Sequence, residues 1–374
     1  PPPPPPPPPP FFLHPYHAIP DAQESRGLGD VYKRQHMYTA NHKINYQLSL
    51  WLISMFWIVS IMIVVGGLTR LTDSGLSITK WQLFSGFLPP LNQEDWISYF
   101  NLYKQIPEFK LQNYNMNMQE FKIIFWWEWA HRFLGRLIGI GFLIPLIYFS
   151  FKISISKLYS LYLIFFLICF QGFIGWYMVS SGLVDRVDVS HFRLSIHLLI
   201  AFIILSLIFW NYLKLNLSYN TTNKINPLIP LVFLTLVFTQ IVIGAFVSGM
   251  DAGKIYNSWP NMGTAYFPDD NEFVNLFKLS AFSDPSLVQF IHRNLAYIIG
   301  FYYLFMFYKI YKDKIFDLYK SINVLGFFIL LQIFLGIITV LYGAQIYIAS
   351  MHQISSIFLV SSCIYFLFLN TRFN

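Results

Sequence analysis

Eight apolar runs, each about 20 residues or longer, constrain this chain more than any other feature of its sequence. A run of that length can cross the hydrocarbon core of a bilayer as a helix. Hydrophobic residues make up 55% of the 374-residue chain and charged residues 11%, which is too apolar for a soluble domain of this size. The runs cover residues 48–69, 124–150, 159–180, 192–212, 228–249, 287–309, 321–343 and 347–369. We therefore expect an all-α polytopic membrane protein with eight transmembrane helices.

An internal repeat relates the first four runs to the last four. The repeat-related pairs include Gly66 and Gly244, Asp73 and Asp251, His131 and His292, Gly175 and Gly336, and His197 and His352. The number of residues that separates the two members of a pair falls from 178 to 161 and then to 155 along the chain, because the second half has shorter outer loops. Four helices per repeat is an even number, so the halves should share one orientation. We expect two pseudo-symmetric four-helix bundles in tandem, over residues 37–220 and 221–374.

Residues 1–36 differ in composition from the rest of the chain. The chain opens on ten consecutive prolines, and 12 of its 21 prolines lie within the first 20 residues. From Met37 onward the sequence is rich in Ile, Asn, Lys and Phe instead. We therefore expect that the natural chain starts at Met37 and that residues 1–36 are extraneous or disordered.

The distribution of charged side chains predicts how the helices are oriented. Lysines follow the second, fourth and sixth runs, whereas the long loop over 250–286 carries five acidic residues and two lysines. Because loops rich in Lys and Arg stay on the cytoplasmic side, both termini should be cytoplasmic. The two long loops, over 70–123 and 250–286, should lie outside. No basic tract is interleaved with aromatic residues, so we expect no nucleic acid as a partner.

Four histidines lie at repeat-related positions within the predicted helices. They are His131, His197, His292 and His352, on the second and fourth helix of each half. Each lies within about two turns of the outer end of its helix, on the order of 10 Å at 1.5 Å per residue. Facing side chains from two helices are how a bundle holds a cofactor, and His is a standard axial ligand of haem iron. A lone intramembrane His is usually a packing residue, but this pattern favours two bis-His haem pockets.

The two halves differ at one position that bears on chemistry. Glu128 in the first half corresponds to Gln289 in the second. A carboxyl group can transfer protons or stabilise a cation, whereas a neutral amide can do neither near pH 7. Glu128 lies three residues before His131, so both side chains project from one helix face. This asymmetry favours a reacting haem in the first half and a resident haem in the second, although Glu128 could instead serve only to pair with Arg132.

Other polar residues near the outer helix ends are open to two interpretations. The arginines there are Arg70, Arg132, Arg136, Arg193 and Arg293. Arginine pairs well with carboxylates, so these residues could bind haem propionates, with Arg70, Arg132 and Arg293 as the main candidates. Ordinary interfacial anchoring accounts for any one of them equally well. His191 has no histidine partner in the other half, where Ile346 takes its position, so we interpret it as an interfacial residue or as one that lies behind the ligands of a site.

Two motifs resemble those of the haem A synthase family, in particular its alphaproteobacterial and mitochondrial branch. Gly66–Ser77, at the end of the first helix, is similar to one family signature. Glu128–Arg132 is similar to the Glu-x-x-His-Arg element of the family. The resemblance extends from about Met37 to the C-terminus. Some members carry a cysteine pair in the first outer loop, and this sequence has none there.

The resemblance implies an enzyme, an oxidoreductase that acts on the C8 methyl group of haem O. Successive hydroxylations would give a geminal diol, which loses water to form the formyl group of haem A for cytochrome c oxidase. The resemblance also implies that His131 and His197 hold haem O as substrate, with Glu128 at the reacting centre. His292 and His352 would be the axial ligands of a haem b cofactor that relays electrons.

The resemblance further implies a location and a set of partners. The chain would be a multi-pass protein of the bacterial inner membrane, with the mitochondrial inner membrane as the alternative, and its haem sites would lie toward the outer face. Expected partners are haem O, membrane lipid, haem O synthase (the protohaem farnesyltransferase), cytochrome oxidase assembly factors and an electron acceptor that the sequence does not identify. A further partner that the sequence allows is a second copy of this chain, in a homo-oligomer.

Two other function classes fit parts of the same pattern. A di-haem b-type cytochrome would also use four histidines, but transmembrane electron transfer usually stacks haems across the bilayer, and here all four lie near one face. A transporter would account for the repeat and would use the polar groups as a proton or substrate path. Two permanently bound, unmodified haems would indicate the cytochrome, and protein without haem absorption would indicate the transporter.

Overall fold

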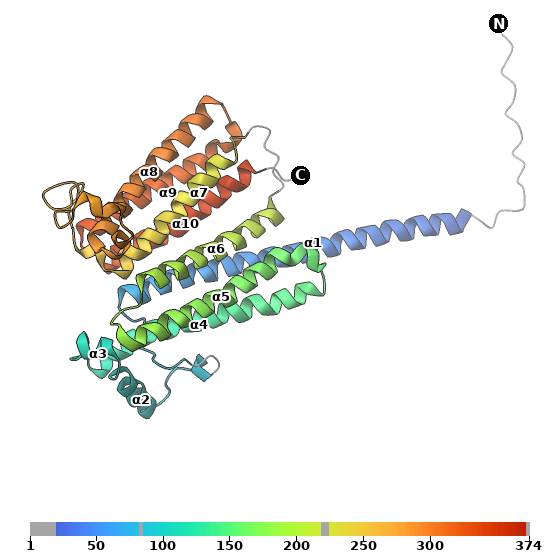
Figure 1. The fold of residues 1–374 in the computed structure, drawn as a ribbon. Helices are drawn as coiled ribbons and strands as arrows, with labels where there is room; N and C mark the ends of the chain where they lie inside the picture. The colour runs from blue at the N-terminus through green and yellow to red at the C-terminus, as the bar shows by residue number, and fades with distance from the viewer. Residues whose placement is uncertain (1–19, 82–84, 218–223, 372–374) are drawn as a thin grey trace, which may run out of the picture. The chain divides into compact units, whose positions relative to one another are not determined.

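The computed structural model describes residues 20–81, 85–217 and 224–371, and within these ranges it is helical and has no strand. The long helices are α1 (Pro20–Leu71), α4 (Met118–Ser150), α5 (Ile155–Asp185), α6 (His191–Asn216), α7 (Leu228–Gly249), α8 (Pro285–Lys312), α9 (Phe316–Leu341) and α10 (Ile346–Asn370) (Figure 1). The expected all-α class is confirmed. The predicted run 321–343 extends past the end of its helix, because Gly343 and Ala344 adopt φ of 61° and 55° and end the helical path.

Seven of these helices are long and apolar enough to cross a membrane, which makes the chain a multi-pass membrane protein. The seven are α4, α5, α6, α7, α9, α10 and the part of α1 from His42 to Leu71, counted over the described residues. Helix α8 is not among them, although it has 28 residues. Its polar residues, including His292, Arg293 and Asn294, lower its mean hydropathy. Prediction and structure therefore agree for seven spans, and an eighth span through α8 stays a prediction.

The chain divides into two compact units, Pro1–Leu48 and Ser49–Asn374, and all contacts described below lie within the second. Residues 1–19 of the predicted N-terminal segment lie outside the described residues, and residues 20–36 form the first part of α1. The predicted boundary between the two halves, at residues 220 and 221, also lies outside the described residues. The expectation that Met37 is the natural start stays a prediction.

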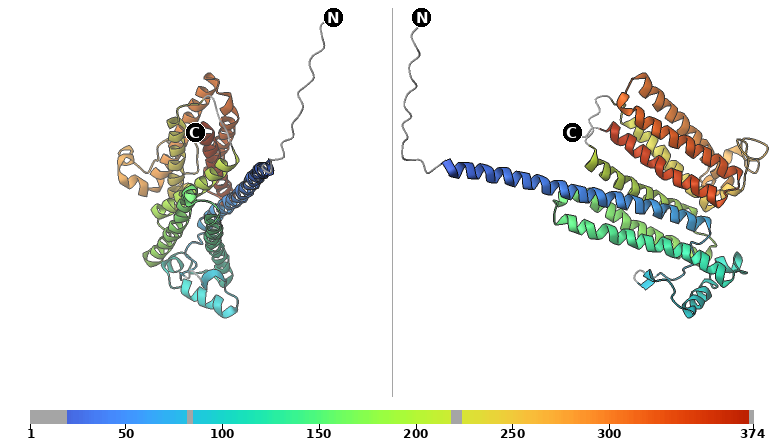
Figure 2. Two further views of the ribbon diagram at one scale, coloured as in Figure 1. Left: turned by 90° about the vertical axis from the view of Figure 1, so that its right-hand side faces the viewer. Right: turned by 180° about the vertical axis from the view of Figure 1, so that it is seen from behind.

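Within the second unit the helices form two neighbouring groups. Helices α4, α5 and α6 pack in chain order beside the apolar part of α1, and α7 to α10 pack on one another (Figure 1). Helix α6 also packs on α7 and α10, so it joins the groups. Figure 2 presents the same groups from two other sides, with the loops that follow α1 and α7 at the same end of the helices. This end carries the site described below.

A proline inside α4 is compensated by a side chain from α1. Pro145 has no N–H, so it cannot donate to the carbonyl of Gly141 one turn earlier. The indole N–H of Trp51 donates to that carbonyl instead, at 3.0 Å. An unpaired carbonyl is costly at membrane depth, so this bond both satisfies the backbone and attaches α1 to α4.

The loop after α1 is folded and packs as a cap on the start of α4 and the end of α5. It contains η1 (Ser85–Phe87), α2 (Gln93–Tyr103) and α3 (Pro107–Leu111). Its buried core, together with that of α4, consists of Leu76, Ile78, Trp96, Phe100, Tyr103, Ile106, Phe121, Ile124 and Phe125. Helix α4 follows directly after this folded loop. A capping box between Asn117 and Glu120 starts the helix six residues before the predicted run 124–150. The loop after α7 is built from the short helices η2 (Ala252–Lys254), η3 (Phe273–Phe277) and η4 (Leu279–Ser283).

The loops after α1 and α7 begin with the same backbone conformation. Asp73 and Asp251, which the repeat superposes, have φ of 48° and 51°. Asp is one of the few residues other than Gly that adopts this left-handed region readily. The repeat read from the sequence therefore recurs in the local structure at the ends of α1 and α7.

Candidate active site

One cavity brings the predicted site residues together. Its volume is about 1270 Å³, above the roughly 300–1,000 Å³ of an ordinary ligand pocket. Its lining includes Glu128, His131, His197, Gln289, His292 and His352, together with Arg70, Arg132, Arg136 and Arg293. Arg193 and His191 are not part of this lining. Residues from α1 and α4 to α10 all contribute, so the cavity extends across both predicted halves.

The first pair of histidines has the spacing that a metal between two imidazoles requires. The ring centres of His131 and His197 lie 6.4 Å apart, with 27° between the ring planes. Two metal–nitrogen bonds of about 2 Å each, plus about 1 Å from each nitrogen to its ring centre, span about 6 Å. The pair therefore fits an iron held between α4 and α6, as in a bis-His haem.

Each of the four cavity histidines packs against a glycine of a neighbouring helix. The pairs are His131 with Gly66, His197 with Gly175, His292 with Gly244, and His352 with Gly336. A Cβ atom at any of these glycines would lie only 2.7–3.1 Å from Cε1 of the imidazole, closer than side chains normally approach. The glycines thus allow the imidazoles to approach a helix backbone closely. The sequence signal was present, because these glycines are themselves repeat-related.

The second pair of histidines has one polar neighbour, Gln240, that the first pair lacks, and one, Gln332, whose repeat partner Gln171 donates to the His197 carbonyl at 2.9 Å. The amide nitrogen of Gln240 lies 3.4 Å from Nε2 of His292 and also donates to the His292 carbonyl at 3.0 Å. The amide nitrogen of Gln332 lies 3.3 Å from Nε2 of His352. The repeat places Met62 of α1 opposite Gln240, so the first half has an apolar side chain at that position. Gln240 was not identified from the sequence.

The carboxylate of Glu128 is buried, with 3% of its surface exposed, and is fully hydrogen-bonded. One oxygen accepts from the hydroxyl of Ser77 and the N–H of Ile78, both at 2.7 Å. The other accepts from Nε and Nη2 of Arg132, at 3.0 and 2.5 Å. The pairing with Arg132 that the spacing allowed is therefore present. It fixes the negative charge at the cavity wall, beside His131 on the same helix.

The replacement of Glu128 by Gln289 in the second half is matched by a change in the loop that each residue meets. Ile78 and Tyr256 occupy repeat-related positions in the loops after α1 and α7. Glu128 accepts a hydrogen bond from the Ile78 N–H, whereas Gln289 donates one to the Tyr256 carbonyl at 3.0 Å. Glu128 and Gln289 each hold one of these loops against a helix, but only Glu128 does so with a charged group.

The predicted propionate-binding arginines are engaged with protein atoms in this structure. Arg132 donates to the carbonyls of Ile78 and Lys80, and Arg293 donates to those of Tyr256 and Ser258. These carbonyl pairs are again repeat-related, so the two arginines hold the loops after α1 and α7 in the same way. The prediction that they also pair with propionates is left open, since both line the cavity.

Arg70 links the loops after α1 and α7 directly. Its guanidinium contacts Asp73 at 2.5 Å and Asp251 at 3.2 Å, and Lys254 contacts the same Asp251 at 2.9 Å. Burial acts to raise the pKa of Asp251, but the hydrogen bond from Lys254 and the charge of Arg70 outweigh it and lower this pKa. The residue that the repeat relates to Arg70 is Ser248, so the second half has no arginine to form a corresponding bridge.

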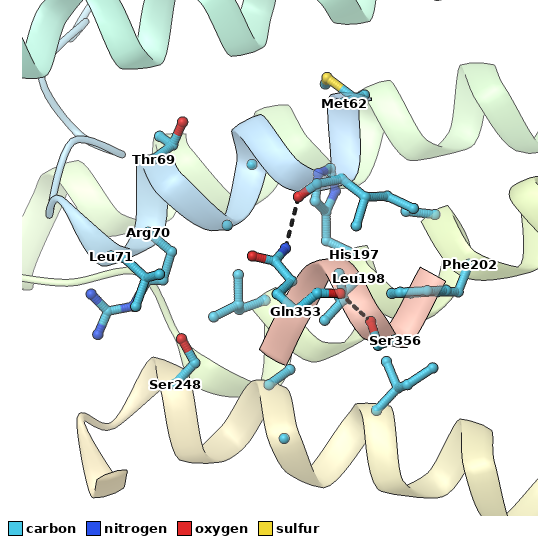
Figure 3. A pocket seen from close by; sticks show the side chains of 18 of the residues that line it. Met62, Thr69, Arg70, Leu71, His197, Leu198, Phe202, Ser248, Gln353 and Ser356 are labelled. Atoms are coloured by element: carbon cyan, nitrogen blue, oxygen red, sulfur yellow. Dashed lines mark hydrogen bonds between the residues drawn. The ribbon is translucent and has the colours of Figure 1, made fainter. Parts of the chain in front are cut away.

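Gln353, the residue after His352, links the two predicted halves and was missed by sequence reasoning. Its side chain reaches from α10 toward α1 and donates to the Ile63 carbonyl at 2.7 Å (Figure 3). It lies flat against Gly67, where a Cβ atom would overlap the amide group. Because Gly66 in turn packs on His131, a continuous contact path joins one histidine pair to the other.

We predict that Gly67→Ala destabilises the protein by about 1–3 kcal/mol, because the methyl group displaces Gln353 and breaks its bond to Ile63. Gly139→Ala is the matched control, since its new Cβ would meet no atom within 4 Å. The double variant Gly67→Ala/Gln353→Ala should lose less than the sum of the single changes. The measurement is the unfolding midpoint in detergent, and strict additivity would show that the two residues are not coupled.

His191, which the sequence left as an interfacial residue or one behind the ligands of a site, packs at the contact between α6 and α7. A Cβ atom at Gly249 would lie 2.8 Å from the His191 Cβ, and the imidazole meets the ring of Phe246 edge-on at 5.4 Å. The residue therefore serves helix packing. It offers a control histidine for experiments on the cavity.

Comparison with known proteins identifies the family. Residues 49–364 match the family model described as "Cytochrome oxidase assembly protein". The chain belongs to this family. The match covers all the residues of the cavity described above, and it agrees with the resemblance carried by Gly66–Ser77 and Glu128–Arg132.

Individual relatives within this family are similar to the chain over nearly their whole length. The protein named "Heme A synthase" from Pelagibacter ubique is 51% identical over 329 residues, which is 87% of this chain and 97% of that protein. A "Heme A synthase" from Rickettsia bellii is 42% identical over 85% of this chain and 96% of its own length. One from Flavobacterium johnsoniae is 40% identical over 86% of this chain and 97% of its own length.

Proposed function

We propose that this chain is an oxidoreductase that converts the C8 methyl group of haem O into the formyl group of haem A. The relatives named "Heme A synthase", at up to 51% identity over most of the chain, support this activity. The reaction would proceed by successive hydroxylations and loss of water, and its product would serve cytochrome c oxidase. Haem O is the substrate in this proposal and haem b is a resident cofactor.

The observation that carries the proposal is the shared cavity with Glu128, His131 and His197 on one side. The 6.4 Å spacing of the two imidazoles suits axial ligation of the substrate iron. The carboxylate of Glu128 lines the same cavity from the helix that carries His131. The substrate would thus be held with a fixed negative charge beside it.

Glu128 is proposed to act through its charge. Oxidation of a methyl carbon draws electrons away from it, so partial positive charge develops there. A preorganised carboxylate at the cavity wall stabilises such charge without having to reorganise. The four hydrogen bonds from Ser77, Ile78 and Arg132 hold this group in one orientation.

His292 and His352 are proposed to hold haem b between α8 and α10. Both line the cavity and rest on repeat-related glycines, as the first pair does. A bound haem b supplies one-electron redox chemistry. The amide of Gln240 beside Nε2 of His292 distinguishes this pair, because Met62 takes the equivalent position in the first half. The neutral Gln289 leaves the pair without a carboxylate at the Glu128 position.

The finer architecture and location are also proposals. We propose eight membrane spans in two pseudo-symmetric bundles, residues 37–220 and 221–374, which the repeated glycine–histidine pairs and the matching Asp73 and Asp251 turns support. We further propose the bacterial inner membrane, with cytoplasmic termini and the cavity toward the outer face. Haem O synthase, oxidase assembly factors and an electron acceptor are the proposed partners, and a homo-oligomer is left to experiment.

The test is pigment extraction from cells that express this chain together with a source of haem O. Haem A should appear only when both are present. Cells without the chain, and cells with the chain but no haem O, are the controls. If the extract contains haem O and no haem A, the proposed function is wrong, and two unmodified haems in the purified protein would then indicate an electron-transfer cytochrome.

A further inference from the structure

A second buried acid, Glu108 in α3, lines the same cavity and is not used by the proposed function. Only 2% of its surface is exposed. One carboxyl oxygen accepts from the hydroxyl of Tyr103 at 3.2 Å and from the amide of Asn113 at 3.4 Å. The other oxygen, Oε2, is buried and makes no hydrogen bond to the protein. A buried carboxyl oxygen without a partner is costly, so its persistence at a cavity wall points to a ligand or a proton there.

The surroundings of Glu108 suit proton exchange near neutral pH. Burial raises the pKa of this carboxyl to about 8, against the hydrogen bond from Tyr103, which acts to lower it. The negative charges of Glu128 in α4, Asp188 before α6 and Asp73 after α1 raise the pKa further. No arginine or lysine of the described residues forms an ion pair with Glu108. Glu128 differs in this respect, since it forms an ion pair with Arg132.

Glu108 also has a hydrogen-bonded connection away from the cavity. The hydroxyl of Tyr103 donates to Glu108 and accepts from the amide of Asn113 at 2.8 Å. Tyr103 is fully buried, whereas Asn113 is partly exposed at the surface of the cap. The outer loop of the second half contributes Asp251 to the cavity as its acid, and Arg70 and Lys254 pair with it. An unpaired buried acid is therefore a feature of the reacting half.

We propose that Glu108 is a second acid–base group of this cavity, which takes up a proton released during oxidation of the substrate and passes it to the outer aqueous side. The inference rests on the proposed function. The step is a proton transfer alone: an O–H bond of water or of the hydroxylated substrate breaks, and an O–H bond forms at Oε2 of Glu108. The carboxyl group changes neither oxidation state nor covalent partners, and the electrons follow the haem chemistry.

The variant that tests this role is Glu108→Gln, measured in the purified full-length protein with its haem. The amide keeps the size of the side chain and an oxygen for Tyr103 and Asn113, but it cannot take up a proton. Turnover at saturating haem O should fall by about a hundredfold, with KM unchanged. Because the group must be ionised to accept a proton, wild-type turnover should rise as the pH increases through about 8, and the variant should lose this rise.

Two further variants and a second measurement complete the test. Glu94→Gln, an exposed acid in α2, is the matched control and should behave as wild type. Glu108→Asp retains a carboxyl group and should recover part of the turnover together with a pH-dependent rise. Infrared difference spectra across pH 7 to 9 should show a protonated carboxyl that ionises near pH 8 in wild type and is missing in Glu108→Gln.

Each result of these measurements either supports or overturns the proposed role of Glu108. Unchanged turnover and an unchanged pH profile in Glu108→Gln would overturn the proposal, and so would a raised KM at constant kcat, which would indicate substrate binding instead. Failure of wild type and Glu94→Gln to form any haem A would count against the proposed function itself. The infrared titration needs no turnover, so it would still show whether Glu108 exchanges a proton.

Discussion

Glu128→Gln should leave haem bound and lower the rate of haem A formation by about a hundredfold or more. The amide has nearly the same shape as the carboxylate and can still accept from Arg132 or Ser77. It carries no charge, however, so it cannot stabilise positive charge that develops at the substrate. The second half provides a natural parallel, because Gln289 occupies the equivalent position. The measurement is the ratio of haem A to haem O in extracts, normalised to the bound haem of purified protein.

A structural effect of the same substitution has to be separated from the chemical one. Glu128→Gln leaves the guanidinium of Arg132 without its anionic partner, which should lower the stability by about 1–3 kcal/mol. The bound haem and the unfolding midpoint of each variant are therefore measured together with its rate of haem A formation. Wild-type turnover in a folded, haem-loaded variant would remove Glu128 from the mechanism. If the variant lost both its haem and its turnover, Glu128 would instead have the role of holding the loop that contains Ser77 and Ile78.

The second large effect is expected at the other histidine pair. His352→Ala should abolish the haem b absorption of the purified protein, because it removes one of the two axial ligands that we propose for a haem b between α8 and α10. Turnover should stop as well if this haem relays electrons. His292→Ala should behave in the same way, since the two residues are proposed to act as a pair. The measurement is the reduced-minus-oxidised spectrum at equal protein concentration.

His191→Ala is the control for these histidine variants. Its side chain packs between α6 and α7 and is not part of the cavity lining, so its removal should cost packing energy but retain haem. His352→Gly offers a further check, because added imidazole can occupy the space and restore the spectrum. An unchanged haem spectrum in His352→Ala would contradict the ligand assignment.

Several features of the site could be predicted from the sequence because they depend on spacing along single helices. The three-residue step from Glu128 to His131 places both on one helix face whatever the surroundings. The repeat pairs His131 with His292, and the structure lines one cavity with both. Helix lengths follow from long apolar runs, since a helix closes its hydrogen bonds within the run. Helix ends were less predictable, as the capping box that starts α4 before its apolar run illustrates.

Contacts between segments far apart in the chain were decided by the tertiary structure alone. Gln353 meets Ile63 across 290 residues, and Arg70 meets Asp251 across 181. Glu108 has no repeat partner and no motif, and its burial depends on how the cap folds over α4 and α5. Such contacts depend on how each helix is rotated about its axis and on the path of each loop. Side-chain periodicity indicates which face of a helix is apolar, but it does not indicate which residue of another helix that face will meet.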